Sequence, residues 1–182
     1  MSPYVKEPFQ YSLHYMEKMG GEVFHKEFLA DETRDPRYDI AKSMADNIPE
    51  NACVLSYNMS FECGRIEYLA GLFPQFKDKL LKIKGNIKDL LDVFKSGMVY
   101  NRAMGGSFSL KSVLPALFPG CKDVDYHSLK EVHNGSEATD TYLSLRKLQG
   151  KAREDTRRNL QEYCKLDTYA MVLILQKLYE LV

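Results

Sequence analysis

Tyr163 and Asp167, four residues apart near the C-terminus, are the first candidates for chemistry in this chain. The stretch around them, 160–175, has no Gly or Pro and is rich in good helix formers. Side chains four residues apart on a helix lie one turn apart on the same face, so a phenol and a carboxylate would meet at one point. The apolar residues around them recur at helical spacing. This pattern predicts that the pair lies at the edge of a core and faces a cleft.

The pair alone has little specificity. With 12 Tyr and about as many Asp in 182 residues, one such spacing is expected by chance. A Tyr at a core edge beside a solvated Asp would give the same pattern. The pair gains weight from its context, because it lies in an apolar helix and a second polar motif lies upstream.

The second motif follows a short apolar run. Residues 53–57 are typical of a strand buried in a sheet, and Asn58–Glu62 come directly after it, where the next helix is expected to begin. An acid at the carboxyl end of a strand lies at the rim of a sheet, where sites are usually built. The alternative is that Glu62 is only a first-turn acid that complements the helix dipole.

The elements that must position these residues belong to a mixed α/β chain. Alternation of side chains predicts strands at 9–16 and 22–30, joined as a hairpin through Gly20-Gly21. The run 87–94 fits either a strand or a helix, and 120–134 is expected to be mostly loop. Helices are predicted in six places: after Asp35-Pro36, at 61–73, after Pro74, at 109–118 around Pro115, at 136–148 and at the C-terminus.

Composition is that of an ordinary globular protein and limits the classes of partner. A length of 182 residues fits one domain. The 25 basic and 25 acidic side chains give a net charge of +0, which offers no general attraction to nucleic acid or to a membrane surface. The four cysteines lack the spacing of a zinc site or a disulfide frame and are expected to be reduced thiols. Without a signal peptide or a membrane-length apolar run, a cytoplasmic protein with no membrane partner is expected.

Asn58-Met59-Ser60-Phe61-Glu62 and Tyr163-Cys164-Lys165-Leu166-Asp167 together resemble the second and third motifs of the DnaQ-like (DEDD) exonucleases, which have a ribonuclease H-like fold. Those motifs are Asn-x-x-Phe-Asp and Tyr-x-x-x-Asp, so Glu62 stands in place of Asp. The alternative third motif, His-x-x-x-x-Asp, is absent because no acid follows His127 or His133 at that spacing. The Tyr subtype, as in family-B DNA polymerase proofreading domains, is the one supported.

The likeness extends over nearly the whole chain. Four segments also resemble an uncharacterised bacterial domain family of the same superfamily: 8–15, 54–65, 107–115 and 162–171. The resemblance implies one α/β ribonuclease H-like domain over 1–182, with an Asp-x-Glu on a first strand just before Pro3-Tyr4. No Asp-x-Glu occurs in the chain. We therefore expect a domain that lacks its first strand, cut from a longer protein with further domains, and an unpaired sheet edge that favours self-association.

The resemblance implies a 3′–5′ exonuclease that hydrolyses DNA or RNA with Mg²⁺ or Mn²⁺, hard cations that take oxygen ligands. Asp167 would bind one metal and Glu62 the other, directly or through water. Tyr163 would orient the attacking water, since a phenol with a pKa of about 10 is a poor base but a good hydrogen-bond partner. Asn58 and Phe61 would contact a single-stranded end. With the Asp-x-Glu missing, this chain alone is expected to bind metal weakly and to be inactive.

Two other functions stay open. The domain could be a non-catalytic module that binds nucleic acid or protein, or a specificity partner for a nuclease centre in another domain. Weaker site candidates are Asp92, as a metal ligand, and the basic run 147–158, as a phosphate contact. For the basic run a solvated helix face is the simpler interpretation, and His133 is expected to be a loop residue.

Overall fold

The computed structural model describes residues 7–120 and 135–181. Within them the chain is mixed α/β, mostly helical, with two small sheets of two strands each. This confirms the α/β class at the coarse level. The expected loop at 120–134, with His133 in it, lies outside the described residues apart from Gly120. None of the helices in the described ranges combines the length and apolar character needed to cross a bilayer.

The predicted hairpin is present. Strand β1 (Gln10–Tyr15) pairs antiparallel with β2 (Phe24–Leu29), and Tyr11 lies opposite Phe28. Gly20 has a φ of 73°, a left-handed conformation that costs glycine little because it has no Cβ. Alternation along β1 gives the hairpin two different faces. One face carries Tyr11 and Leu13, and the other carries Ser12 and His14.

Short strands and helices follow the hairpin in chain order. The second sheet is parallel and consists of β3 (Val54–Ser56) and β4 (Ile87–Asp89). The ambiguous run 87–94 is thus a strand of three residues followed directly by a helix. The helices are α1 (Arg37–Asn47), α2 (Ser60–Leu72), α3 (Pro74–Gly85), α4 (Leu91–Lys95), α5 (Leu110–Leu117), α6 (Gly135–Ser144) and α7 (Gly150–Glu180), with 3-10 turns η1 (Arg102–Met104) and η3 (Leu145–Lys147).

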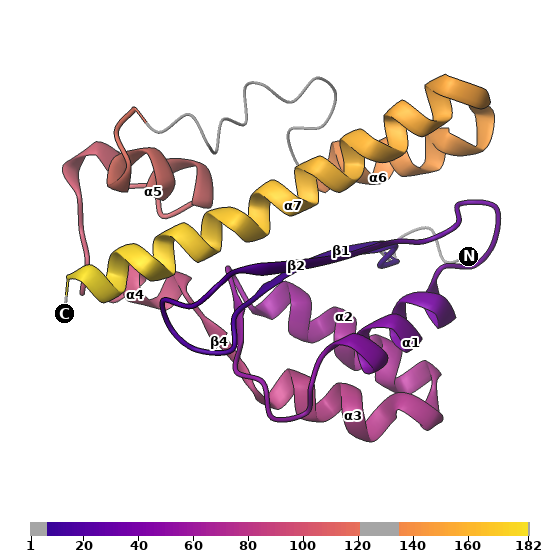
Figure 1. The fold of residues 1–182 in the computed structure, drawn as a ribbon, viewed down its shortest axis with the longest axis horizontal. Coiled ribbons are helices and arrows are strands. Elements are labelled where there is room, and N and C mark those ends of the chain that lie inside the picture. The colour runs from indigo at the N-terminus through magenta and orange to yellow at the C-terminus, as the bar shows by residue number, and fades with distance from the viewer. Residues whose placement is uncertain (1–6, 121–134, 182) are drawn as a thin grey trace.

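The hairpin lies between two layers of helices (Figure 1). Helix α7 crosses one face, and α1, α2 and α3 cover the other. The apolar face of the hairpin packs on the second layer, because Tyr11, Leu13 and Phe28 contact the core that includes Ile40, Leu69, Leu80 and Ile83. The polar face is the one that meets α7.

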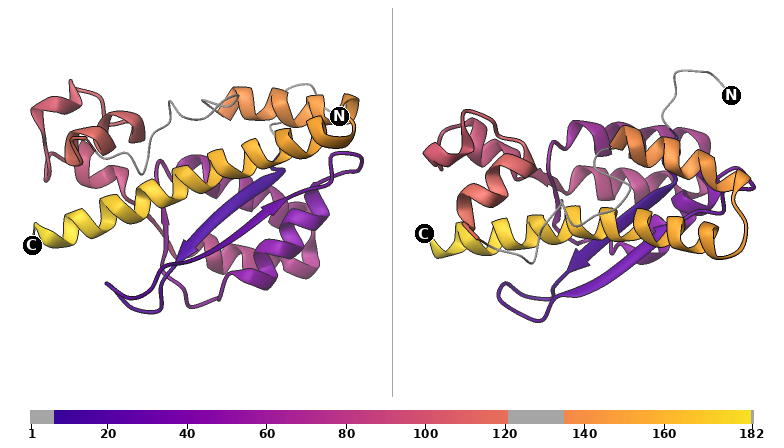
Figure 2. Two further views of the ribbon diagram at one scale, coloured as in Figure 1. Left: turned by 45° about the horizontal axis from the view of Figure 1, so that its top comes forward. Right: turned by 90° about the horizontal axis from the view of Figure 1, so that it is seen from above.

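Helix α7 joins two further cores at its two ends (Figure 2). Its N-terminal half packs with α6 and the end of the hairpin through Leu160, Tyr142 and Leu29. Its C-terminal half packs with α4 and α5 through Ala170, Ile174 and Phe94. Pro115 lies inside α5 without ending it. These two cores and the polar face of the hairpin together give α7 three separate sets of contacts, which fix the residues near its middle.

The two sheets are not hydrogen-bonded to each other in the part of the chain that the structure describes. The amide of Ala30 donates to the carbonyl of Phe9 at 2.9 Å. Phe9 and every second residue after it therefore exchange backbone hydrogen bonds with β2, whereas the backbone groups of Ser12 and of every second residue on either side of it point away from β2. Likewise Val54 and Ser56 bond toward β4, which directs the backbone of Leu55 to the other side. In the described residues, the edge of β1 that faces away from β2 and the edge of β3 that faces away from β4 therefore pair with no other strand.

Candidate catalytic site

Glu62 lies in the first turn of α2, directly after the carboxyl end of β3. The turn between strand and helix contains Asn58, whose φ of 71° is the only positive value among non-glycine residues that the structure describes. Asn tolerates this left-handed conformation better than most residues. The side chain of Asn58 is used within the turn, since its Oδ1 accepts a hydrogen bond from the Ser60 hydroxyl at 3.1 Å.

The carboxyl group of Glu62 is largely buried and incompletely satisfied. Its Oε2 is shielded from solvent and has no hydrogen-bond partner. Burial raises the pKa of Glu62, its own backbone amide and the Ser56 hydroxyl beside it oppose the rise only in part, and the charge of Asp89 adds to it. A buried carboxylate oxygen without a donor is a costly feature. A cation at this point would satisfy the oxygen and offset the repulsion from Asp89.

Tyr163 and Asp167 meet on α7 as their spacing predicts. Tyr163 is 9% exposed and packs with Leu29 and Ala30 at the end of the hairpin. Its hydroxyl donates a hydrogen bond to the Asp167 carboxylate. Burial raises the pKa of the Tyr163 phenol, and the charge and hydrogen bond of Asp167 add to the rise. Tyr163 is thus a neutral hydrogen-bond donor at any ordinary pH.

One turn of α7 around this pair is bonded to the polar face of β1. The Thr168 hydroxyl lies 2.7 Å from the Ser12 hydroxyl and 2.7 Å from Nδ1 of His14. The backbone amide of Ser12 donates to the sulfur of Cys164, which covers part of the open edge of β1. Burial, together with the positive charges of His25 and Lys165, lowers the pKa of His14 to about 4. These bonds set the position of Asp167 relative to the hairpin.

A buried ionic cluster fixes the preceding turns of α7. Glu32 is 0% exposed, and its carboxylate pairs with Arg153 and Arg157. Arg157 also donates to the carbonyl of Leu29 at 3.2 Å, and Arg146 donates to the carbonyl of Glu32 at 2.7 Å. The basic run therefore differs from the expected solvated face, because two of its arginines are committed to one buried acid.

The two motifs have different immediate neighbours, and in the part of the chain that the structure describes only the residue that precedes Asn58 is shown to share a cluster with part of α7. Tyr57, which follows β3, belongs to the same apolar cluster as Leu166 and Tyr169 of α7. Glu62 has Ser56 and Asp89 beside it, whereas Asp167 has Tyr163. Within the described ranges, no group of three or more His, Cys, Asp or Glu side chains could hold a metal ion. In this part of the chain, Glu62 and Asp167 belong to no such group.

Phe61 is the exposed member of the second motif. Its ring is 54% exposed, and the guanidinium of Arg65 lies 5.8 Å from the ring centroid. A large aromatic side chain in contact with solvent next to Glu62 is available to stack on a base. Asp92, the weaker candidate, lies in the first turn of α4 and is exposed.

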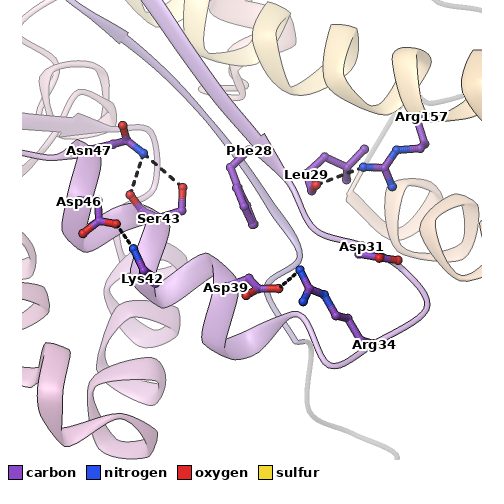
Figure 3. Close-up of a pocket in the computed structure, with 10 residues that line it drawn as sticks. All are labelled: Phe28, Leu29, Asp31, Arg34, Asp39, Lys42, Ser43, Asp46, Asn47 and Arg157. Atoms are coloured by element: carbon purple, nitrogen blue, oxygen red, sulfur yellow. Dashed lines mark hydrogen bonds and ion pairs between the residues drawn. The ribbon is translucent and has the colours of Figure 1, made fainter.

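A cavity lies elsewhere, at the outer side of β2 (Figure 3). Its volume is about 450 Å³; Arg157 of the basic run lines it, whereas Glu62, Tyr163, Asp167 and the other residues of the two motifs do not. Its walls carry three acids and three bases, which largely pair with each other or with Glu32, as in Arg34–Asp39 and Lys42–Asp46. We therefore do not take this open, charge-balanced groove as the site of chemistry.

Asp89 is the residue of the site that sequence reasoning missed. It ends β4 and lies opposite Ser56 in the parallel register. Its Oδ1 accepts the amide of Asn58 at 2.8 Å, and its Oδ2 accepts the amide of Met59 at 2.9 Å. Asp89 lies inside the ambiguous run 87–94, two residues after Ile87, so no local pattern marked it.

A family model for a domain of unknown function, DUF2779, matches residues 1–109. This is more than half of the chain, so the chain belongs to the DUF2779 family. The match contains Asn58–Glu62 and Asp89 and ends before Tyr163 and Asp167. Comparison with curated proteins gave no match, and neither did comparison with solved structures.

Proposed function

We propose that this DUF2779 chain carries part of the active site of a DnaQ-like exonuclease of the DEDD Tyr subtype, on a ribonuclease H-like domain. The reaction would be 3′–5′ hydrolysis of phosphodiester bonds at a single-stranded DNA or RNA end. One observation carries the proposal. A hydrogen-bonded Tyr163–Asp167 pair lies on α7, and Tyr57, in the turn that precedes the helix of Glu62, packs against the same apolar cluster as Leu166 of α7.

Oxygen ligands suited to Mg²⁺ or Mn²⁺ support the proposal. Asp167 and Glu62 would hold the cations, and the buried, unpartnered Oε2 of Glu62 fits a role as ligand. When bound, such ions activate water and stabilise the leaving oxygen of a phosphodiester. Because the described residues contain no complete ligand group, further carboxylates have to come from elsewhere.

An additional strand is the proposed source of these carboxylates. The open edges of β1 and β3 would both be paired by one strand placed between the two sheets. An Asp-x-Glu on that strand would put two acids on one of its faces. This chain alone is therefore expected to bind metal weakly and to be inactive.

The residues of this chain would act by binding and orientation. Tyr163 stays protonated, so its hydroxyl can hold Asp167 and orient a water molecule but cannot remove a proton. Phe61 would stack on a base near the strand end, and Asn58 would act mainly through the backbone turn that it stabilises.

A nuclease assay tests the proposal. The chain and a version extended by the residues encoded upstream are incubated with labelled single strands of DNA and of RNA in Mn²⁺. We expect only the extended protein to shorten them, stepwise from the 3′ end. An extended protein that carries an Asp-x-Glu yet leaves both substrates intact would contradict the proposal.

A non-catalytic module is the second candidate. Glu62 in place of Asp, and the absence of a three-ligand group from the described residues, both favour it. Such a module would bind a single strand or a protein partner without metal. Binding of the same oligonucleotides by the extended protein in EDTA, with no hydrolysis in Mn²⁺, would support this alternative.

A further inference from the structure

The segment that carries Glu62 is attached to β4 through Asp89. Helix α2 has no side-chain cap of its own, because Met59 at its start makes no such hydrogen bond. Asp89, on a different strand, instead accepts the amides that directly precede the helix. Its carboxylate accepts the amides of Asn58 at 2.8 Å, Met59 at 2.9 Å and Leu91 at 3.0 Å. One side chain thus ties the start of α2 to the start of α4.

The hydrogen bonds of Asp89 explain how the turn at Asn58 is held. A left-handed conformation at a non-glycine residue costs free energy and persists only when its surroundings enforce it. The amide of Asn58 itself and that of the next residue both point to the Asp89 carboxylate. Hydrogen bonds to a charged acceptor are about twice as strong as neutral ones. Asp89 is therefore the group that enforces the turn from outside it.

We infer that Asp89 is a positioning residue for Glu62, through its hydrogen bonds to the turn between β3 and α2. This inference rests on the proposed function, since it concerns the placement of a metal-binding carboxylate. A role as a metal ligand fits Asp89 less well, because its Oδ1 already accepts two amides. Groups that orient a ligand from behind typically change metal affinity 10- to 100-fold, by the order of magnitude seen in metalloproteins.

The experiment compares the full chain with Asp89→Asn, Asp89→Glu and the control Asp78→Asn. Asp78 lies on α3 and is exposed, so its substitution removes the same charge without touching the turn. Two quantities are measured by NMR in each protein. One is the hydrogen-exchange rate of the backbone amides of Asn58 and Met59, and the other is the Mn²⁺ concentration that broadens the resonances around Glu62.

We expect Asp89→Asn to accelerate exchange at both amides more than about tenfold and to weaken Mn²⁺ binding at Glu62 about tenfold. Asp89→Glu keeps the charge and should recover part of the amide protection. The control should change neither quantity. Unchanged amide protection in Asp89→Asn would overturn the inference, as would unchanged Mn²⁺ affinity once the amides are freed. Unfolding of both Asp89 variants would assign the residue a purely structural role.

The same data separate this inference from the proposed function. If Mn²⁺ fails to broaden the Glu62 region of the unsubstituted chain at any concentration, the proposed metal site is contradicted. The exchange rates of Asn58 and Met59 then still decide whether Asp89 holds the turn.

Discussion

Glu32, in the segment that follows β2, is buried and paired with Arg157 of α7, 125 positions away in the sequence. Burial alone would raise the pKa of Glu32, but its hydrogen bond with Arg153 and the charges of Arg157 and Arg153 lower it. The acid is therefore ionised and surrounded by arginines. This pairing joins the end of the hairpin to the part of α7 that precedes Tyr163, so it helps to set where the Tyr163–Asp167 pair lies.

Removing the charge of Glu32 should destabilise the chain strongly. Glu32→Gln leaves Arg153 and Arg157 without their buried partner, and breaking a buried pair in this way costs about 3 kcal/mol. The free energy of unfolding is measured by urea denaturation. The matched control is Glu22→Gln, an exposed acid near the hairpin turn, for which a change below about 0.5 kcal/mol is expected. Equal effects of the two substitutions would contradict the role given to Glu32.

The burial of His14 should make stability depend on pH. The pKa of His14 is lowered from 6.5 to about 4 in the folded chain, so between these values the unfolded state binds more protons. Its contribution is complete above pH 6.5 and is lost as the pH falls toward 4. Because the imidazole is only partly buried, a loss of roughly 1 kcal/mol is expected.

The matched protein for this prediction is His14→Gln, which cannot be protonated. Urea denaturation from pH 7 to pH 4 should show a smaller decrease in the free energy of unfolding than for the unsubstituted chain. Parallel pH profiles of the two proteins would show that His14 does not titrate with a lowered pKa.

The left-handed backbone at Asn58 predicts that two small substitutions there differ in their effect on stability. Asn58→Ala places a residue with a Cβ at a φ of 71° and should destabilise the chain by about 1 kcal/mol. Asn58→Gly removes the strain but also the hydrogen bond to Ser60, and should be close to neutral. Thermal unfolding of both variants tests this order of stabilities. If the turn were not left-handed in solution, Asn58→Ala would be more stable than Asn58→Gly.

The exposed ring of Phe61 should matter for substrate and not for folding. Phe61→Ala in the extended protein is expected to weaken binding of a labelled single strand by about 1 kcal/mol or more, the usual range for loss of a base–aromatic stack. Its melting temperature should stay nearly constant, because the ring is 54% exposed. Tyr179→Ala is the control, since that ring is 62% exposed near the far end of α7. If both variants bind the single strand equally well, the substrate does not contact Phe61.

Features encoded by local spacing could be predicted from the sequence. Tyr163 and Asp167 are one helical turn apart, and alternation of side chains identified strand β1. These patterns depend on residues within a few positions of each other. The same holds for the hairpin, whose turn is marked by Gly20-Gly21.

Features that depend on distant partners could not be predicted. Arg153 and Arg157 looked like part of a solvated run, because nothing near them in sequence indicates that Glu32 would be their partner. Asp89 was missed because the run 87–94 contains a strand and a helix too short for periodicity to separate. Its amide partners lie about thirty residues upstream, beyond any local pattern.

The most direct test of the account is the effect of Asp167→Asn on hydrolysis by the extended protein. A 5′-labelled single strand is incubated with Mn²⁺, and the products are resolved by length. The control is Asp140→Asn, which alters an exposed acid on α6. We predict a ladder of products shortened from the 3′ end with the unsubstituted protein and with the control, and no shortened products with Asp167→Asn. Hydrolysis that survives in Asp167→Asn would contradict the account, because the Tyr163–Asp167 pair would then not belong to the active site.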